Sequence, residues 1–217
     1  MSKENTLKRV PKGNIRFKIK LSEEQKKAKE GIYEKDLSIV IGRAASGKTA
    51  LAVLTALDFF FKRKVNKIII SRPIVKNSVG YLPGEIEDKL APHVYPVKHC
   101  MYEAYGREKI DKMFTEGDIE IIPIDFMKGV TYTNSFVIID EFEDLTMEEF
   151  ELCLTRLGKD SKLVFTGAEE QIDKSIKNSC ISKVKCLKDC DLVNYVKLTE
   201  NHRNNIIFDV LNYIKKH

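Results

Sequence analysis

Short apolar runs alternate with longer amphipathic stretches along most of the chain. Six runs are rich in Ile and Val, at residues 37–41, 67–71, 119–122, 136–139, 162–166 and 193–198. Such runs are typical of strands that helices cover on both faces. Helical patterns occur at residues 21–33, 48–63, 83–105, 147–156, 174–188 and 205–216. The alternation predicts an α/β fold of three layers around a central, mainly parallel sheet.

Charge divides the chain into two parts. Residues 1–20 contain seven basic side chains and one acidic one, so this segment carries +6; because the net charge is +5, the remainder sums to about −1. Such an arm can bind phosphates, although a solvated tail has the same composition. No internal repeat or linker is visible after it. We therefore expect a basic arm over residues 1–20 and a single domain over residues 21–217.

Composition argues against membrane and secreted classes. The longest apolar run, residues 51–61, is interrupted by Asp58 and is about half the length of a membrane span. The N-terminus is polar and lacks the pattern of a secretory signal. The five cysteines lack the paired spacing of zinc ribbons, which favours reduced, packed thiols over a metal site. We expect a cytoplasmic protein without a membrane partner.

A glycine-rich segment between the first predicted strand and the next helix matches the pattern G-x4-G-K-[ST]. Glycines let the backbone curl so that successive N–H groups face phosphate oxygens, and the helix N-terminus favours negative charge. We expect the lysine to reach the β- and γ-phosphates of ATP and the threonine hydroxyl to bind Mg²⁺. The predicted nucleotide-binding residues are Gly42, Arg43, Ala44, Ala45, Ser46, Gly47, Lys48 and Thr49.

Two acidic residues follow the apolar run at 136–139. A phosphate loop needs a second, metal-side carboxylate at the end of a neighbouring strand, and Asp140 fits that position. Glu141 would orient or deprotonate the attacking water, which predicts hydrolysis of the nucleotide. An exposed acidic turn is the simpler alternative for the pair. The sequence thus predicts a three-layer P-loop NTPase of the RecA-like kind.

Further motifs resemble those of the PhoH-like ATPases, whose core is similar to the first motor domain of superfamily 1 helicases. The chain is similar to a single-domain, phage-type member over about residues 20–205. Besides the phosphate loop and the 136–141 strand end, the matching stretches are Ile70-Ser71-Arg72-Pro73, Gly80-Tyr81-Leu82-Pro83-Gly84, Leu90-Ala91-Pro92, Ile124-Asp125-Phe126-Met127-Lys128-Gly129, Leu154-Thr155-Arg156-Leu157-Gly158 and Thr166-Gly167-x3-Gln171-Ile172-Asp173.

The resemblance implies additional site residues. Gln171 would sense the γ-phosphate, and Gln25 would read adenine through its amide, although Gln25 also completes a capping box with Ser22. Arg72 begins a motif that faces nucleic acid in the family, and a structural ion pair is its alternative. Arg203 or Arg156 would be the arginine finger, Arg156 for a neighbouring subunit. The family suggests a homo-oligomer, plausibly a hexameric ring.

Two departures from the family pattern affect coupling. The aspartate that normally precedes the sensor glutamine is missing, and Glu169 is a substitute nearby. The family's Asp-Glu-Ala-Gln strand end reads Asp140-Glu141-Phe142-Glu143, so the coupling glutamine is replaced by an acid. Communication between the nucleotide and a bound strand therefore differs from the family pattern.

Three functions compete. The leading hypothesis is an ATPase that acts on, or is stimulated by, single-stranded RNA or DNA. The second is an assembly factor without motor activity, whose oligomer forms or dissolves with ATP occupancy. The third, a small-molecule kinase, would need an arginine-rich lid, for which the sequence offers no convincing candidate.

Overall fold

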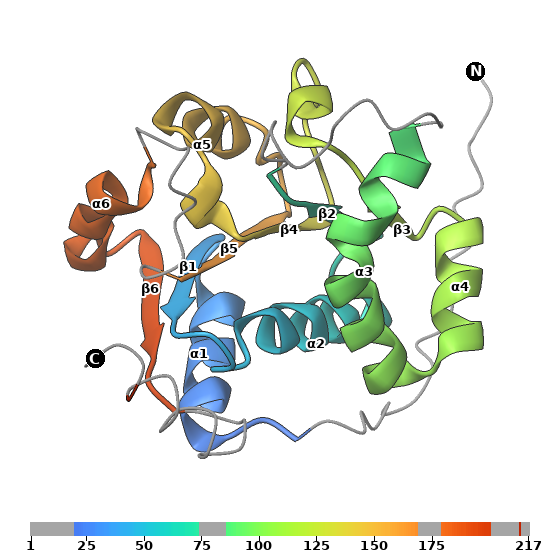
Figure 1. Ribbon diagram of the computed structural model, residues 1–217, viewed down its shortest axis with the longest axis horizontal. Coiled ribbons are helices and arrows are strands. Elements are labelled where there is room, and N and C mark those ends of the chain that lie inside the picture. Colours follow the sequence, from blue (N-terminus) through green and yellow to red (C-terminus); the bar gives the residue numbers. More distant parts are fainter. Residues whose placement is uncertain (1–19, 74–85, 169–178, 201–212, 214–217) are drawn as a thin grey trace.

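The computed structural model describes residues 20–73, 86–168, 179–200 and 213, with the backbone alone for residues 86–94. Its strands form one six-stranded sheet in the order β3–β2–β4–β5–β1–β6 (Figure 1). Every pairing between neighbouring strands is parallel. The strands are β1 (Leu37–Gly42), β2 (Lys67–Ser71), β3 (Ile119–Ile121), β4 (Ser135–Asp140), β5 (Lys162–Gly167) and β6 (Val193–Leu198). The predicted α/β fold is confirmed.

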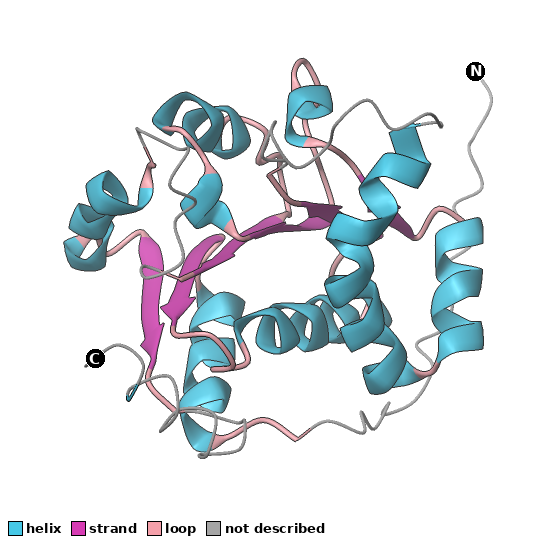
Figure 2. Cartoon of the chain, in the orientation of Figure 1, coloured by secondary structure: helices cyan, strands magenta, loops and turns pink. Residues whose placement is uncertain are grey.

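Helices cover both faces of this sheet (Figures 1 and 2). One face packs against α1 (Glu23–Glu34), α2 (Lys48–Phe61), α3 (Ile86–Tyr105) and α4 (Arg107–Thr115). The other packs against η1 (Ile124–Met127), η2 (Phe142–Asp144), α5 (Met147–Leu154) and α6 (Ile181–Val184), and η3 (Lys185–Asp189) continues α6. Successive strand residues alternate between the two cores, as Ile68 and Ile69 do. This is why the strands are apolar at consecutive positions.

Several helices differ from the sequence-based expectation. The chain forms α4 after Gly106, where no helix was predicted, and α5 ends at Leu154 rather than at residue 156. Of the helix predicted over residues 174–188, the described part contains only the short α6 followed by η3. The helix predicted over residues 205–216 lies outside the described residues except for Tyr213, which is helical.

Candidate functional site: a phosphate loop facing a strand-end acid

The segment between β1 and α2 has the backbone of a phosphate loop. Ala45 and Gly47 adopt left-handed conformations, with φ of 67° and 79°. A side chain at Gly42 would lie 2.5 Å from the Ser46 hydroxyl and 2.8 Å from the Leu198 carbonyl oxygen, so this position requires glycine. Gly47 precedes α2 without a side-chain cap, which leaves the amides of the first helical turn available to an anion.

Lys48 folds back over this loop. Its Nζ atom donates hydrogen bonds of 2.9 Å to the carbonyl oxygens of Gly42 and Arg43. Burial lowers the pKa of the Lys48 ammonium, whereas the nearby carboxylates of Glu143, Asp140 and Glu141 oppose that shift. The ammonium group of Lys48 is therefore held by carbonyl oxygens of the phosphate loop, and three carboxylates lie near it.

Asp140 is the meeting point of the loop and the sheet. Its Oδ1 atom accepts a hydrogen bond of 3.0 Å from the Thr49 hydroxyl and one of 2.5 Å from the Thr166 hydroxyl. Burial raises the pKa of the Asp140 carboxyl above its ordinary value, although these hydroxyls and Arg72 oppose the shift. The two proposed Mg²⁺ ligands thus lie in contact, although they are 91 positions apart in the sequence.

The strand that carries Asp140 is not adjacent to the strand that precedes the loop. We expected the acid on a neighbouring strand, but β5 lies between β1 and β4. Thr166 of β5 pairs with Asp140 on one side and with Val40 on the other. The intervening strand therefore supplies the hydroxyl that holds Asp140 in place.

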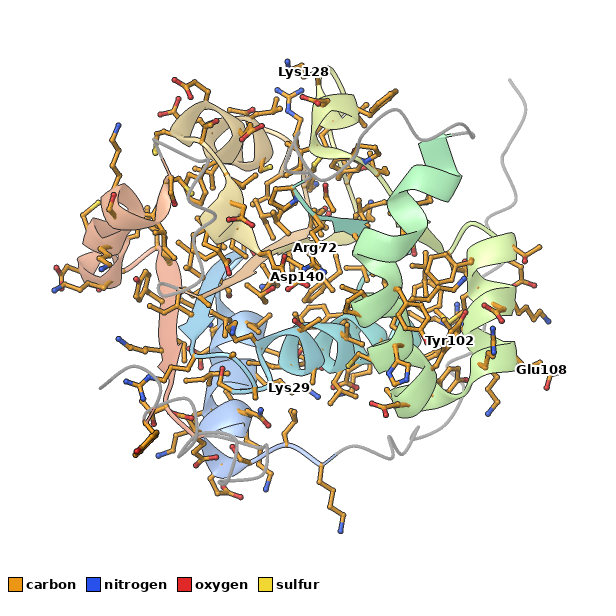
Figure 3. All side chains as sticks on the ribbon, in the orientation of Figure 1. Lys29, Arg72, Tyr102, Glu108, Lys128 and Asp140 are labelled. Carbon is orange, nitrogen blue, oxygen red and sulfur yellow. The ribbon has the colours of Figure 1, made fainter. Side chains whose placement is uncertain are left out.

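Arg72 fixes Glu141, the residue that follows Asp140 in the sequence. Figure 3 labels Arg72 and Asp140, and Arg72 is close enough to oppose the rise in the pKa of Asp140. The guanidinium pairs with both carboxylate oxygens, and Nε donates to Oε2 at 2.8 Å. Glu141 also has a left-handed backbone, with φ 56° and ψ 44°, which is uncommon outside glycine and occurs at functional sites. The sequence left two roles open for Arg72, contact with nucleic acid or a structural ion pair, and the structure contains the ion pair.

The first turn of α1 braces the loop. Gln25 is 4% exposed, and its Nε2 donates to the Ser46 carbonyl oxygen at 3.1 Å. Its Oε1 accepts from the Ser22 amide at 3.0 Å, which completes the predicted capping box. The neighbouring Glu24 accepts hydrogen bonds from Thr199 and Glu200, just after β6. Both amide atoms of Gln25 are therefore used within the chain, and adenine contact remains a prediction.

The sequence analysis did not predict the contacts that three residues make at the site: Thr166, Glu24 and Glu143. Thr166 is the last residue but one of β5 and pairs with Asp140, so the parallel strand pattern was the available signal. Glu143 was noted only as a replacement for glutamine, yet it is buried close enough to influence Lys48. The contacts of Glu24 are tertiary and left no local sequence signal.

The candidate finger Arg156 does not join the loop within the described residues. Its side chain donates to the Thr155 hydroxyl and the Val130 carbonyl oxygen, and its own carbonyl accepts from the Tyr132 amide. Tyr132 precedes β4, whereas Asp140 ends it, and the six residues of this strand span about 17 Å. Gln171, Arg203, Glu169 and nearly all of the basic arm lie outside the described residues.

Comparisons with known proteins place this site in a family. The model of the PhoH-like protein family matches residues 18–214. The chain belongs to this PhoH-like family. The PhoH-like protein of Bacillus subtilis is 34% identical over 169 residues, covering 76% of this chain and 53% of the relative. That of Mycobacterium bovis is 34% identical over 179 residues, covering 81% and 51%. The chain spans about half the length of the curated relatives it matches.

A solved structure supports the same fold at lower sequence similarity. The large terminase of a thermophilic bacteriophage has a TM-score of 0.50 and 12% identity, covering 83% of this PhoH-like chain and 46% of the terminase. The family match and this fold together support a three-layer P-loop core. Within the described residues, no helix combines the length and apolarity needed to cross a membrane.

Proposed function

We propose that this PhoH-like chain binds ATP with Mg²⁺ and hydrolyses it, and that single-stranded RNA or DNA binds to it or stimulates the reaction. The observation that carries the proposal is the contact between the Thr49 hydroxyl and Asp140. It brings a phosphate loop and a strand-end carboxylate together at one edge of the sheet. Such convergence of loop, lysine and acid favours a triphosphate as the ligand.

The loop residues bind the phosphates in this proposal. The amides of the loop and of the first turn of α2 donate to phosphate oxygens, and Lys48 moves from the carbonyls of Gly42 and Arg43 to the terminal phosphates. The Ser46 hydroxyl is buried and has no hydrogen-bond partner in the described structure, so it is a further donor for a bound oxyanion.

The residues also fit a magnesium ion. Thr49 and Asp140 offer hard oxygen ligands, and a magnesium ion usually takes one or two protein ligands while phosphates and waters complete its shell. Thr49 and Asp140 would hold the ion, which would neutralise charge on the phosphates. Cysteine and histidine ligands are not needed for such a site.

Glu141 orients the attacking water. A carboxylate oxygen has two lone pairs, so Glu141 can accept from Arg72 and from a water molecule at the same time. Because Arg72 contacts both oxygens, the carboxylate is restricted to one orientation. An oriented acceptor next to the terminal phosphate favours hydrolysis over phosphate transfer to a small molecule.

The nucleic-acid part of the proposal rests on the charge of the basic arm, and the oligomer part rests on the position of Arg156. The basic arm of residues 1–20 can neutralise phosphodiester groups. Arg156 lies far along the sheet from Asp140 and would therefore act as a finger only for a neighbouring copy in an oligomer, plausibly a hexameric ring. Arg203 is the alternative finger from the same chain, and Gln171 is the proposed phosphate sensor.

Two substitutions and one titration test the proposal. Lys48→Ala should weaken ATP binding, whereas Glu141→Gln should bind ATP with Mg²⁺ but hydrolyse it slowly, as measured by equilibrium binding and phosphate release. Equal hydrolysis rates in Glu141→Gln and the parent protein would remove Glu141 from its role. Absence of nucleotide binding by the parent would refute the proposal as a whole.

The nucleic-acid part needs a separate measurement. Titration with homopolymeric RNA or single-stranded DNA at low salt should raise the ATPase rate. Deletion of residues 1–20 should raise the half-saturating concentration, since the arm carries the net positive charge of the chain. A flat rate across the titration would favour the assembly-factor alternative.

A further inference from the structure

Glu143 is a buried carboxyl group for which the proposed hydrolysis has no use. It lies in η2, three residues after Asp140, and is 2% exposed. Its backbone is held in place, because the Ser179 hydroxyl donates to the Glu143 carbonyl oxygen at 2.6 Å. The side chain packs against Gly167 so closely that a Cβ atom at that position would clash with Oε2. Glu143 is therefore fixed inside the candidate site.

The two oxygens of this carboxyl group are unequally satisfied. Backbone amides of Ala168 and of Glu143 itself provide hydrogen bonds to the side chain. Oε2 is buried and has no hydrogen-bond partner among the described residues. An unpartnered carboxylate oxygen inside a protein is costly, whereas a protonated one needs less solvation. The geometry alone thus favours the neutral form.

The neighbouring acidic groups also favour the neutral form of Glu143. Among the described residues, Lys48 of α2 is a cation that faces Glu143, and the acids Glu141 and Asp144 belong to the same segment as Glu143. The Cys180 thiol faces it from the turn before α6. Burial raises the pKa of Glu143 to about 7, and the two acids add to the rise while the backbone amides oppose it.

Binding of a triphosphate changes the charges around Glu143 in two ways. The phosphates attract Lys48 and bring several negative charges close to Glu143. Both changes disfavour a carboxylate at this position.

We infer that Glu143 takes up a proton when a nucleoside triphosphate binds, and that the neutral carboxylic acid is its form in the occupied site. The inference rests on the proposed nucleotide binding and adds to it a proton linkage. A neutral carboxyl group has one O–H donor and one C=O acceptor. A glutamine amide likewise has a C=O acceptor and N–H donors, so the two groups can make similar hydrogen bonds. Glu143 would thus stand in for the glutamine that the family pattern has at this position.

The sign of the linkage follows from the two protonation states. Below about pH 7 the free protein already has a neutral Glu143, so binding takes up no proton there. Above about pH 7 the free protein has a carboxylate that must be protonated on binding. Affinity for the triphosphate therefore falls as the pH rises, by up to about tenfold per pH unit.

Calorimetry with a non-hydrolysable ATP analogue and Mg²⁺ measures this proton directly. Titrations in two buffers with different ionisation enthalpies give the number of protons taken up at about pH 8, where Glu143 is charged in the free protein. The parent should take up between about half a proton and one proton more than Glu143→Gln, because the ligand's own titration is common to both. Glu148→Gln, which removes an exposed acid from α5, should behave as the parent does.

The outcomes separate this inference from the proposed function. If the parent and Glu143→Gln both bind the analogue with equal proton uptake, the inference is overturned and the proposed function stands. If the parent does not bind the analogue, both are overturned. Should Glu143→Gln fail to fold, the parent alone decides, because no net uptake at about pH 8.5, where the ligand is fully ionised, overturns the inference.

Discussion

Gln25 offers a sharp test, since two roles predict different results for the same substitutions. In the structure its amide joins the start of α1 to the phosphate loop, through the Ser22 amide and the Ser46 carbonyl oxygen. Gln25→Ala removes both contacts. Gln25→Glu keeps an acceptor for Ser22 but places a second oxygen against the Ser46 carbonyl. The pair of variants thus separates the helix cap from the loop brace.

The expected magnitudes follow from these contacts. Loss of a capping interaction costs about 1 kcal/mol, and a buried carbonyl left without its donor costs about 1–3 kcal/mol. Gln25→Ala should therefore lower the free energy of unfolding by about 2–4 kcal/mol. Gln25→Glu keeps the cap, but it should still lower the free energy of unfolding by at least about 1–3 kcal/mol, because a carboxylate is buried beside a carbonyl.

The brace also predicts how nucleotide affinity responds. Because the loop contacts phosphates, which all nucleoside triphosphates share, both variants should weaken ATP and GTP by the same factor, about tenfold for a loss of 1.4 kcal/mol. Denaturant unfolding and equilibrium binding of the two nucleotides are the measurements. A changed ratio of ATP to GTP affinity, with unfolding unaffected, would refute the brace and support adenine recognition by Gln25.

The remaining predictions concern packing, orientation and thiol chemistry. Gly167→Ala should lower the free energy of unfolding by about 1–3 kcal/mol in urea, because the new methyl group clashes with a buried carboxyl oxygen; unchanged stability would contradict the packing. Arg72→Ala should lower kcat by up to about 100-fold with little change in KM for ATP, because Glu141 loses its fixed orientation. A change in KM with kcat unaltered would contradict this role. Burial raises the pKa of Cys153 to about 12, so at about pH 8 iodoacetamide should modify exposed Cys186 first, as mass spectrometry can follow; faster modification of Cys153 would contradict its burial.

The fold was largely predictable because the strands are apolar at consecutive positions. The bounds predicted for β2 and β6 agree residue for residue with those observed. The helix α4 was missed because its sequence is mostly polar and only Gly106 separates it from α3. Strand order is a property of tertiary packing, so the sequence pattern did not reveal that β5 lies between β1 and β4.

The candidate site was predictable where function depends on local pattern. The loop and Asp140 lie together as expected, because the ends of parallel strands meet at one edge of the sheet. The clamp of Arg72 on Glu141 and the burial of Glu143 depend on contacts between distant segments, which no spacing rule reports. The sequence therefore predicted which residues lie together at the candidate site more reliably than the contacts that orient their side chains.

The position of β5 places one strand in contact with both acids of the site, Asp140 and Glu143. Because this strand separates the loop strand from the acid strand, Asp140 is held through the Thr166 hydroxyl. The same strand ends at Gly167, which contacts Glu143, and Ala168 provides that carboxyl with an amide donor. A shift at the end of β5 would therefore reach the metal-side acid and the buried carboxyl together. Because the predicted sensor Gln171 follows this strand in the sequence, we expect β5 to be the route by which a signal from a bound phosphate reaches both acids.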